Sequence, residues 1–517
     1  MGMCWGHPAT IRLSMNMAPA GNMHSVALAV FCVAFALVTV AGFLAAKWRR
    51  PDEGLHSLEE WGLGGRSFGT LITWFLLGGD VYTAYTVIAV PAALYGAGAL
   101  GFFAVPYTIL IYPYMMLVLP KLWTVCHRNG YVTFADFVKG RFEFRPLTVA
   151  IALTGILSLM PYIALQLVGM KVALAAMGLR GEWPLILAFL ILAFYTYSAG
   201  LRAPAIIAVV KDIMLYVMVI AAVIWLPSKL GGFGHIFAVA AAELPKHTPP
   251  GGTLLKAGQL LPYSTLAIGS ALALILYPHT STATLSSSGP QTLRRNAALL
   301  PAYTLMLGLL ALLGYVALAA GVKAADKSEV IPLLFLNGFP EWFAGFCLAA
   351  VAIGALVPAA IMSIAAANLF TRNLWGEFVK TPMSAQKEAA QAKIVSLIVK
   401  FGALAFVLET PGSYAIEMQL LGGIWITQLF PAVVCGAFVK RRTLHPWAVF
   451  AGWLAGMVWG SGMAIALEFK GSGVYPLHVF GQTWSMYAAI PALILNLVIS
   501  FGLSPVFARI RPVAVSA

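Results

Sequence analysis

Long apolar runs separated by short polar segments make up most of the sequence. A helix needs roughly 20 apolar residues to cross a hydrocarbon core of about 30 Å, and it satisfies its own backbone hydrogen bonds. By this measure the pattern predicts thirteen membrane-spanning helices, at residues 25–46, 70–95, 100–123, 147–177, 184–198, 204–226, 265–286, 297–322, 342–370, 394–408, 414–439, 446–467 and 484–501. No small-residue cleavage site follows the N-terminal residues, so we expect the first run to be a retained helix and not a signal peptide.

The basic residues between the runs predict the orientation of the chain. Loops rich in Lys and Arg stay on the cytoplasmic side of a membrane. If the N-terminus is outside, about 21 of the 32 Lys and Arg residues fall on the inner side and about 8 on the outer side. We therefore expect a multi-pass protein of a bacterial inner membrane with its N-terminus out and its C-terminus in.

The composition excludes a soluble domain and disfavours several functions. The chain is 61% hydrophobic and 10% charged, whereas soluble domains hold about a quarter charged residues. The net charge of +14 comes from short basic clusters spread between apolar runs, which is not the single basic face that a nucleic-acid partner requires. The five cysteines form no CxxC pair, so we expect no disulfide framework, no zinc site and no cofactor.

The second span is interrupted by two glycines and an acidic residue. The segment Gly78-Gly79-Asp80-Val81-Tyr82 places Asp80 about 15 Å along the span, near the middle of the membrane. A charge at that depth costs at least about 2.5 kcal/mol on insertion scales, so it indicates a functional site. The alternative is an acid that packs against a neighbouring helix.

A second interruption occurs in the seventh span, at Tyr277-Pro278-His279. Proline removes a backbone donor and opens the helix. The two interruptions lie five spans apart, in matching positions, as in carriers built from inverted repeats. We therefore expect Gly79, Asp80, Tyr82, Pro278 and His279 to bind substrate. The alternatives are a proline kink and a hydrogen-bonded core histidine.

Three further groups of residues are informative. Tyr162 and Gln166 lie one turn apart on the fourth span, as substrate ligands or as hydrogen bonds between helices. In the sixth span we expect Asp212 to face the bundle and to take part in ion coupling, with its neighbour Lys211 reaching to the inner surface. A doubled GxxxG pattern in the twelfth span predicts a helix contact within the chain or with a second copy, through Gly452, Gly456 and Gly460.

These features resemble the sodium:solute symporter family. The matching segments are Gly64-Gly65-Arg66-Ser67, Gly78-Gly79-Asp80, Tyr162 with Gln166, Gly200-Leu201-Arg202 with Lys211-Asp212, and Ala360-Ile361-Met362-Ser363. They stand in the family's order and spacing, over residues 30–505. The segments 102–113 (FFAVPYTILIYP) and 294–303 (RRNAALLPAY) resemble the monocarboxylate permease branch of the family.

The resemblance implies an all-α polytopic fold of the LeuT-like type with two inverted five-helix repeats. The implied divisions are an extracytoplasmic segment at 1–23, a leading helix at 24–47, the repeats at 70–227 and 265–439, two trailing helices at 446–503 and a cytoplasmic tail at 504–517. This plan agrees with thirteen spans.

The resemblance also implies a sodium site, with one departure. The ligands would be backbone oxygens of Gly78, Val81 and Ala360 and two adjacent hydroxyls, of which Ser363 is present and the second is replaced by Ile364. Sodium prefers hard oxygen ligands, and an isoleucine side chain supplies none. Either the site is weak or coupling uses protons, in which case Asp80 is the expected proton carrier.

The sequence therefore predicts a symporter, and not an enzyme, that takes up short monocarboxylates such as lactate, pyruvate, acetate or propionate with a proton or a sodium ion. One alternative is a sodium-coupled symporter for another small solute, such as an amino acid. Another is a transporter-like solute sensor. An intramembrane enzyme would have only Ser286, Ser287 and Ser288 beside His279 as candidate catalytic groups.

Overall fold

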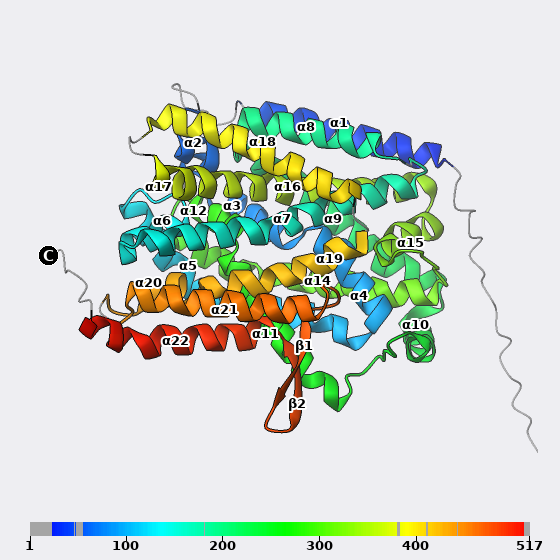
Figure 1. Cartoon of the computed structure of the whole chain (residues 1–517). Coiled ribbons are helices and arrows are strands. Elements are labelled where there is room, and N and C mark those ends of the chain that lie inside the picture. The colour runs from blue at the N-terminus through cyan, green and yellow to red at the C-terminus, as the bar shows by residue number, and fades with distance from the viewer. Residues whose placement is uncertain are drawn as a thin grey trace, which may run out of the picture.

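The computed structural model describes residues 23–45, 47, 55–179, 181–379, 383–409, 412–441 and 443–510, without the side chains of residues 80, 81, 412–416 and 418. Its helices are α1 (Ser25–Ala45), α2 (Leu58–Leu63), α3 (Thr70–Val81), α4 (Val90–Ala97), α5 (Ala104–Arg128), α6 (Phe134–Phe142), α7 (Arg145–Ala176), α8 (Trp183–Ala199), α9 (Arg202–Lys229), α10 (Gly232–Glu243), α11 (Leu260–Leu276), α12 (Pro278–Leu285), α13 (Pro290–Leu299), α14 (Pro301–Ala319), α15 (Val330–Gly338), α16 (Glu341–Leu369), α17 (Gly376–Phe378), α18 (Ala385–Glu409), α19 (Gly412–Ile426), α20 (Gly436–Phe438), α21 (Pro446–Ala466) and α22 (Ala489–Ile510). The long helices run side by side as one bundle (Figure 1). The predicted all-α polytopic fold is confirmed.

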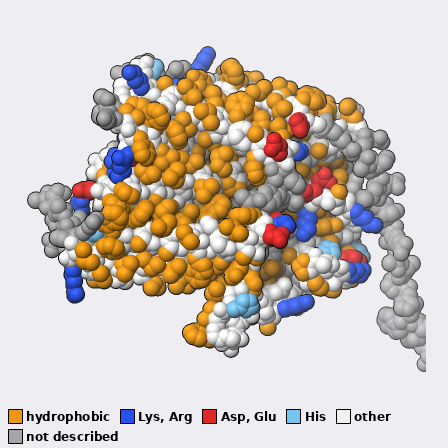
Figure 2. Space-filling model, viewed as in Figure 1, with side chains coloured by type: hydrophobic (Ala, Val, Ile, Leu, Met, Phe, Trp, Pro, Cys, Tyr) orange, Lys and Arg blue, Asp and Glu red, His pale blue; other side chains and the backbone are white. Residues whose placement is uncertain are grey.

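Within the described residues, eleven helical segments are long and apolar enough to cross a membrane. Two further predicted spans correspond to shorter apolar helices, namely the broken segment α3–α4 and α8 (Trp183–Ala199). Figure 2 shows hydrophobic side chains along the flank of the bundle and charged side chains gathered at its two ends. The chain is therefore a multi-pass membrane protein, and the total of thirteen spans stays a prediction.

Helix α16 forms the centre of the bundle. Its apolar membrane-spanning window is completely buried. Ten of its 29 residues are alanine, a small residue that permits close approach of other helices. Helices α7, α9, α12 and α18 pack against it. The centre of the bundle therefore lies next to both interrupted spans, since α12 follows one interruption and α3 also contacts α16.

The last predicted span is wrong in its first residues. Residues 482–487 form strand β2 (Gln482–Tyr487), which pairs antiparallel with β1 (Val474–Val479), and α22 begins only at Ala489. The hairpin projects from the bundle (Figure 1). Trp484 and Tyr487 are apolar enough to extend a predicted span, yet they are also strong strand formers. At the other end, α22 continues to Ile510, so the predicted tail at 504–517 starts as helix.

The glycine face of α21 is used inside the chain. Gly452, Gly456 and Gly460 are buried. A Cβ atom at these positions would lie 2.4 Å from Ser500 Oγ, 2.1 Å from Gln428 Oε1 and 2.8 Å from Ile424 Cγ2, respectively. Of the two predicted roles, the contact within the chain is the one present. This face is therefore closed to a second copy of the chain.

Candidate functional site

The first interruption separates α3 from α4. Helix α3 ends at Val81, and Tyr82 leaves the helical conformation with φ −88° and ψ 84°. The chain continues through a π-helical turn (Tyr85–Ala89) into α4. The last carbonyl oxygens of a helix have no N–H donor inside that helix, so they need donors from elsewhere. The carbonyl of Gly78 still accepts from the backbone N–H of Tyr82 at 3.1 Å, whereas the carbonyl of Gly79 accepts from a side chain of another helix.

Lys211 of α9 supplies a cation to this interruption. Its Nζ donates to the carbonyl oxygens of Gly79 at 2.8 Å and Tyr82 at 3.0 Å, and it lies 3.0 Å from Oδ1 of Asp212. The side chains of Lys211 and Asp212 are both completely buried. The expectation that Lys211 reaches the inner surface is therefore wrong, because two carbonyls and one carboxylate replace the water that its ammonium loses.

Asp212 connects this cation to α14. The hydroxyl of Tyr303 donates to Oδ2 of Asp212 at 2.5 Å, and the hydroxyl of Tyr82 donates to the carbonyl of Tyr303 at 3.0 Å. The ring of Tyr303 packs directly on Gly78, where an added Cβ atom would lie only 2.1 Å from its Cζ. Asp212 thus faces the bundle, as expected, and the interrupted helix is held from both α9 and α14.

The second interruption lies between α11 and α12. Tyr277 is extended, with φ −60° and ψ 137°, as is usual for a residue that precedes proline. The ring centroid of Tyr277 lies 5.5 Å from that of Tyr162 and 5.2 Å from that of His279, and Tyr162 and His279 are 5.3 Å apart. Tyr162 of α7 therefore joins the second interruption through an aromatic cluster.

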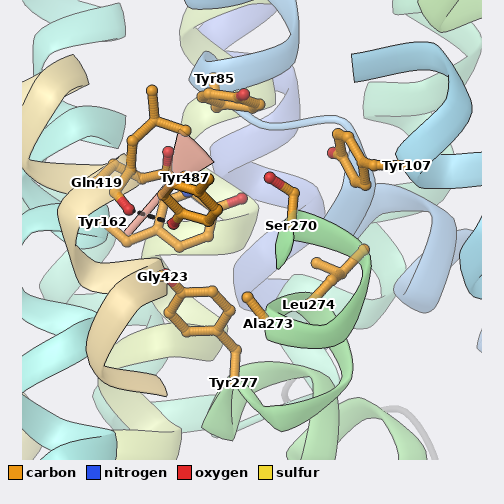
Figure 3. Close-up of a pocket in the computed structure, with 11 residues that line it drawn as sticks. Tyr85, Tyr107, Tyr162, Ser270, Ala273, Leu274, Tyr277, Gln419, Gly423 and Tyr487 are labelled. Carbon is orange, nitrogen blue, oxygen red and sulfur yellow. Dashed lines mark hydrogen bonds between the residues drawn. The ribbon is translucent and has the colours of Figure 1, made fainter. Parts of the chain in front are cut away.

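A small pocket of about 30 Å³ lies between the two interruptions. Its lining comes from both of them and from α5, α7, α11, α19 and the end of β2 (Figure 3), and consists of Tyr85, Tyr107, Tyr162, Ser270, Ala273, Leu274, Tyr277, Gln419, Leu420, Gly423 and Tyr487. Five of these residues are tyrosines and none is charged. The pocket is therefore a largely apolar space edged with hydroxyl groups.

The polar groups of this pocket differ in whether they have partners. The hydroxyl of Tyr487 donates to the carbonyl of Leu420 at 2.6 Å. Among the described residues, the buried hydroxyl of Tyr277 and the buried amide oxygen of Gln419 have no hydrogen-bond partner. A buried polar group without a partner costs about 1–3 kcal/mol. A small polar ligand or water in the pocket would remove this cost.

The structure places the predicted substrate residues in different roles. Tyr162 lines the pocket. Gln166, also on α7, accepts a hydrogen bond from the backbone N–H of Ala84 at 2.9 Å and donates to the carbonyl of Tyr162 at 3.2 Å. Its amide therefore serves the backbone just after the first interruption and does not line the pocket.

The other predicted substrate residues lie around the pocket and not on its wall. Tyr82 packs on Tyr303, at a centroid distance of 4.6 Å. Gly79 contacts Lys211, and Pro278 lies against Gly155 of α7. His279 is completely buried behind the lining residue Tyr277. The side chains of Asp80 and Val81 lie outside the described part of the structure. Substrate binding by this set of residues stays a prediction.

The second half of the expected sodium site faces α18. The hydroxyl of Ser363 donates to the carbonyl of Ala360 at 2.8 Å and accepts a hydrogen bond from the hydroxyl of Ser396 at 3.3 Å. Ser396 accepts in turn from Nζ of Lys400 at 2.9 Å. Ile364 is completely buried and supplies no ligand. Ser396 thus places a second hydroxyl beside Ser363, from the neighbouring helix α18.

Several site residues were missed from the sequence. Tyr85 and Tyr107 lie in predicted spans among many other aromatic residues, so nothing in the pattern separates them. Tyr487 was assigned to a span. Lys400 did carry a signal, because a lysine in a predicted span is rare enough to indicate function by itself.

Comparisons with known proteins show the family of the chain. The family model described as "Sodium:solute symporter family" matches residues 61–460. A monocarboxylate transport permease protein of Rhizobium johnstonii is 51% identical over 495 residues, which cover 95% of this chain and 99% of the relative. An uncharacterized symporter of Bacillus subtilis is 33% identical over 445 residues, or 84% of this chain and 87% of the relative.

A solved structure has the same fold. It is a Na+-coupled sialic acid symporter in a substrate-bound, outward-open state, with a TM-score of 0.74. The match covers 93% of this chain and 98% of that chain at 16% sequence identity, so it bears on the fold alone. The family model and the two relatives span most of the sequence, and the chain therefore belongs to the sodium:solute symporter family.

Proposed function

We propose that this protein is a secondary-active symporter that takes up short monocarboxylates, such as lactate, pyruvate, acetate or propionate. The observation that carries the proposal is the pocket between the two helix interruptions, with its five tyrosines. Carriers built from inverted repeats bind their substrate at such a place. The repeats in this proposal are residues 70–227 and 265–439, with the leading and trailing helices outside them, and no enzymatic activity is assigned.

The chemistry of the pocket suits a small carboxylate. Tyrosine hydroxyls donate hydrogen bonds to carboxylate oxygens, and Tyr277 has a hydroxyl without a partner in the described residues. Helix α12 begins at Pro278, the residue after Tyr277, and helix N-termini favour negative charge. Ala273 and Leu274 add apolar surface for a short alkyl group. The name of the Rhizobium johnstonii relative supports the same substrate class.

We further propose that the coupling ion is a proton. The ammonium of Lys211 already serves the carbonyls of Gly79 and Tyr82 at the interruption in α3. On α16, Ile364 offers no oxygen where the resemblance calls for a hydroxyl. Sodium needs a shell of oxygen ligands. Lys211 and Ile364 together leave fewer oxygen atoms for a sodium ion at the expected site. Sodium coupling is the second candidate, supported by the family and by the Na+-coupled structural neighbour.

The proposal includes an orientation and a location. Basic residues gather in the segments that would be cytoplasmic if the N-terminus is outside. We therefore propose a bacterial inner-membrane location with the N-terminus out and the C-terminus in, where an inward cation gradient would drive uptake.

Uptake of labelled lactate and pyruvate into proteoliposomes tests the proposal, with the pH gradient and the sodium gradient varied independently. We expect accumulation that is driven by an inward proton gradient, collapses with a protonophore and persists without sodium. No uptake above protein-free vesicles under either gradient would remove the function. Accumulation that follows only the sodium gradient would keep the symporter and reject the proton.

A further inference from the structure

The completely buried face of α18 toward α16 holds a lysine that the proposed transport mechanism has not used. Lys400 is 1% exposed, and its Nζ donates to the hydroxyl of Ser396. From there the hydrogen bonds run in one direction, from Ser396 to Ser363 and from Ser363 to the carbonyl of Ala360. Helices α16 and α18 lie side by side over this stretch (Figure 1). The lysine is thus linked to the residues at which a coupling cation is expected.

Lys400 differs from the other fully buried lysine in its surroundings. Lys211 has two carbonyl oxygens and the carboxylate of Asp212 within 3.0 Å. Among the described side chains, Lys400 has one hydroxyl as its hydrogen-bond acceptor and no carboxylate within 4.0 Å. An ammonium carries three donors, and a buried charge needs pairing to persist. The surroundings of Lys211 hold it charged, whereas those of Lys400 allow either form.

The charged groups that contact α18 from its neighbours do so away from Lys400. Lys171 of α7 donates to the carbonyl of Val407 at 3.4 Å, near the end of α18. At the other end, Arg372 pairs with Glu388 at 2.8 Å, and Lys393 donates to the carbonyl of Leu55. No charge from these groups therefore fixes the state of Lys400 directly.

We propose that Lys400, rather than Asp80, carries the coupling proton, and that the hydroxyls of Ser396 and Ser363 hold its amine beside the expected cation site. The inference rests on the proposed function. In each cycle the neutral amine of Lys400 takes one proton from the outer solution and becomes an ammonium. It then returns that proton to the inner solution, so one proton crosses with each substrate and no covalent bond to carbon changes.

The test uses the full-length protein in proteoliposomes, with Lys400→Met and Lys400→Arg as variants. The control is Lys171→Met, which removes a lysine that contacts the same helix. With the outside more acidic by about one pH unit, the wild type and the control should accumulate lactate by up to about tenfold. Both Lys400 variants should reach an accumulation ratio of about one, because neither methionine nor a permanently charged arginine can cycle a proton.

A second measurement separates coupling from folding. In counterflow, vesicles filled with unlabelled lactate take up labelled lactate without net proton movement, and we expect Lys400→Met to retain this exchange. Proton-driven accumulation by Lys400→Met or Lys400→Arg at the wild-type level would overturn the proposal. Loss of counterflow together with accumulation would also overturn it, because Lys400 would then serve translocation itself. A wild type that neither accumulates nor exchanges lactate would instead reject the proposed function.

Discussion

Lys211 and Asp212 follow each other in the sequence and still form a buried ion pair, with 3.0 Å between Nζ and Oδ1. Adjacent residues of a helix point about 100° apart, so the pair forms because the long lysine side chain bends toward the interrupted helix α3. There it also donates to the carbonyls of Gly79 and Tyr82. The pair therefore joins α9 to the interruption at the end of α3.

Removing the lysine should destabilise the protein strongly. Lys211→Met leaves Asp212 buried without its cation, which costs about 3–5 kcal/mol. We expect a large fall in the midpoint of thermal unfolding in detergent, and partial recovery in the double variant Lys211→Met/Asp212→Asn. Lys229→Met, on the exposed end of the same helix, is the control. A single variant as stable as this control would show that the pair contributes little.

The contact between Gly78 and Tyr303 should tolerate no side chain. In Gly78→Ala the new Cβ would lie 2.1 Å from Tyr303 Cζ, so either the ring or α3 must move, at a cost of about 1–3 kcal/mol or more. The hydrogen bond from Tyr303 to Asp212 would move with the ring. We expect lower stability and little uptake.

Gly308→Ala is the matched control for this change. Gly308 lies on α14 with Tyr303, and the nearest side-chain atom to its added Cβ would be at 3.9 Å. This variant should keep wild-type stability and uptake, because alanine fits there and has a higher helix propensity than glycine. Equal behaviour of the two alanine variants would argue against a tight contact at Gly78.

Tyr277 and Tyr487 should separate ligand binding from folding. The hydroxyl of Tyr277 has no partner among the described residues, whereas that of Tyr487 donates to Leu420. Tyr277→Phe should therefore raise the KM for lactate by about tenfold, the equivalent of about 1.4 kcal/mol, with stability unchanged. Tyr487→Phe should lower the unfolding midpoint instead. Uptake kinetics and thermal unfolding of both variants check this, and an unchanged KM in Tyr277→Phe would place the carboxylate elsewhere.

Asp80 remains the acidic residue that the sequence predicts at the first interruption. Asp80→Asn removes the charge with little change in size, so the protein should still insert and reach the membrane in normal amount. We expect it to lose both accumulation and counterflow of lactate, because Asp80 belongs to the predicted substrate-binding set, whereas the loss of Lys400 should spare counterflow; uptake assays and quantitative blotting of the membrane fraction measure this. Undiminished transport by this variant would remove Asp80 from the mechanism.

The membrane helices and both interruptions could be predicted from the sequence, because they depend on local properties. Apolar length sets the spans, and Pro278 opens a helix where it stands. Gly78 and Gly79 lie inside α3, and the break that they predict comes a few residues later, at Tyr82. The hairpin was missed for a local reason as well. Residues such as Trp484 and Tyr487 fit an apolar helix and a strand equally well, and the pairing with residues 474–479 decides between them.

The composition of the pocket and the hydrogen bonds of the buried lysines could not be predicted, because they depend on which helices meet. Tyr85, Tyr107 and Tyr487 come from three distant segments. Ser396 reaches Ser363 across 33 residues of sequence, and Gln166 reaches Ala84 across 82. A single sequence reports that a polar residue lies in a span, but not which backbone group or side chain it meets there.

Gln166 offers a test of how the first interruption keeps its shape. Its amide oxygen accepts from the backbone N–H of Ala84 at 2.9 Å, in a completely buried position. Gln166→Leu fills similar space but leaves that N–H without an acceptor, at a cost of about 1–3 kcal/mol. Gln166→Glu keeps an acceptor oxygen, and if its carboxyl is protonated it should retain more stability than the leucine variant. Thermal unfolding of both variants, with lactate affinity measured in parallel, checks this; if Gln166→Leu lowered affinity without lowering stability, Gln166 would be a substrate ligand and not a support of the interrupted helix.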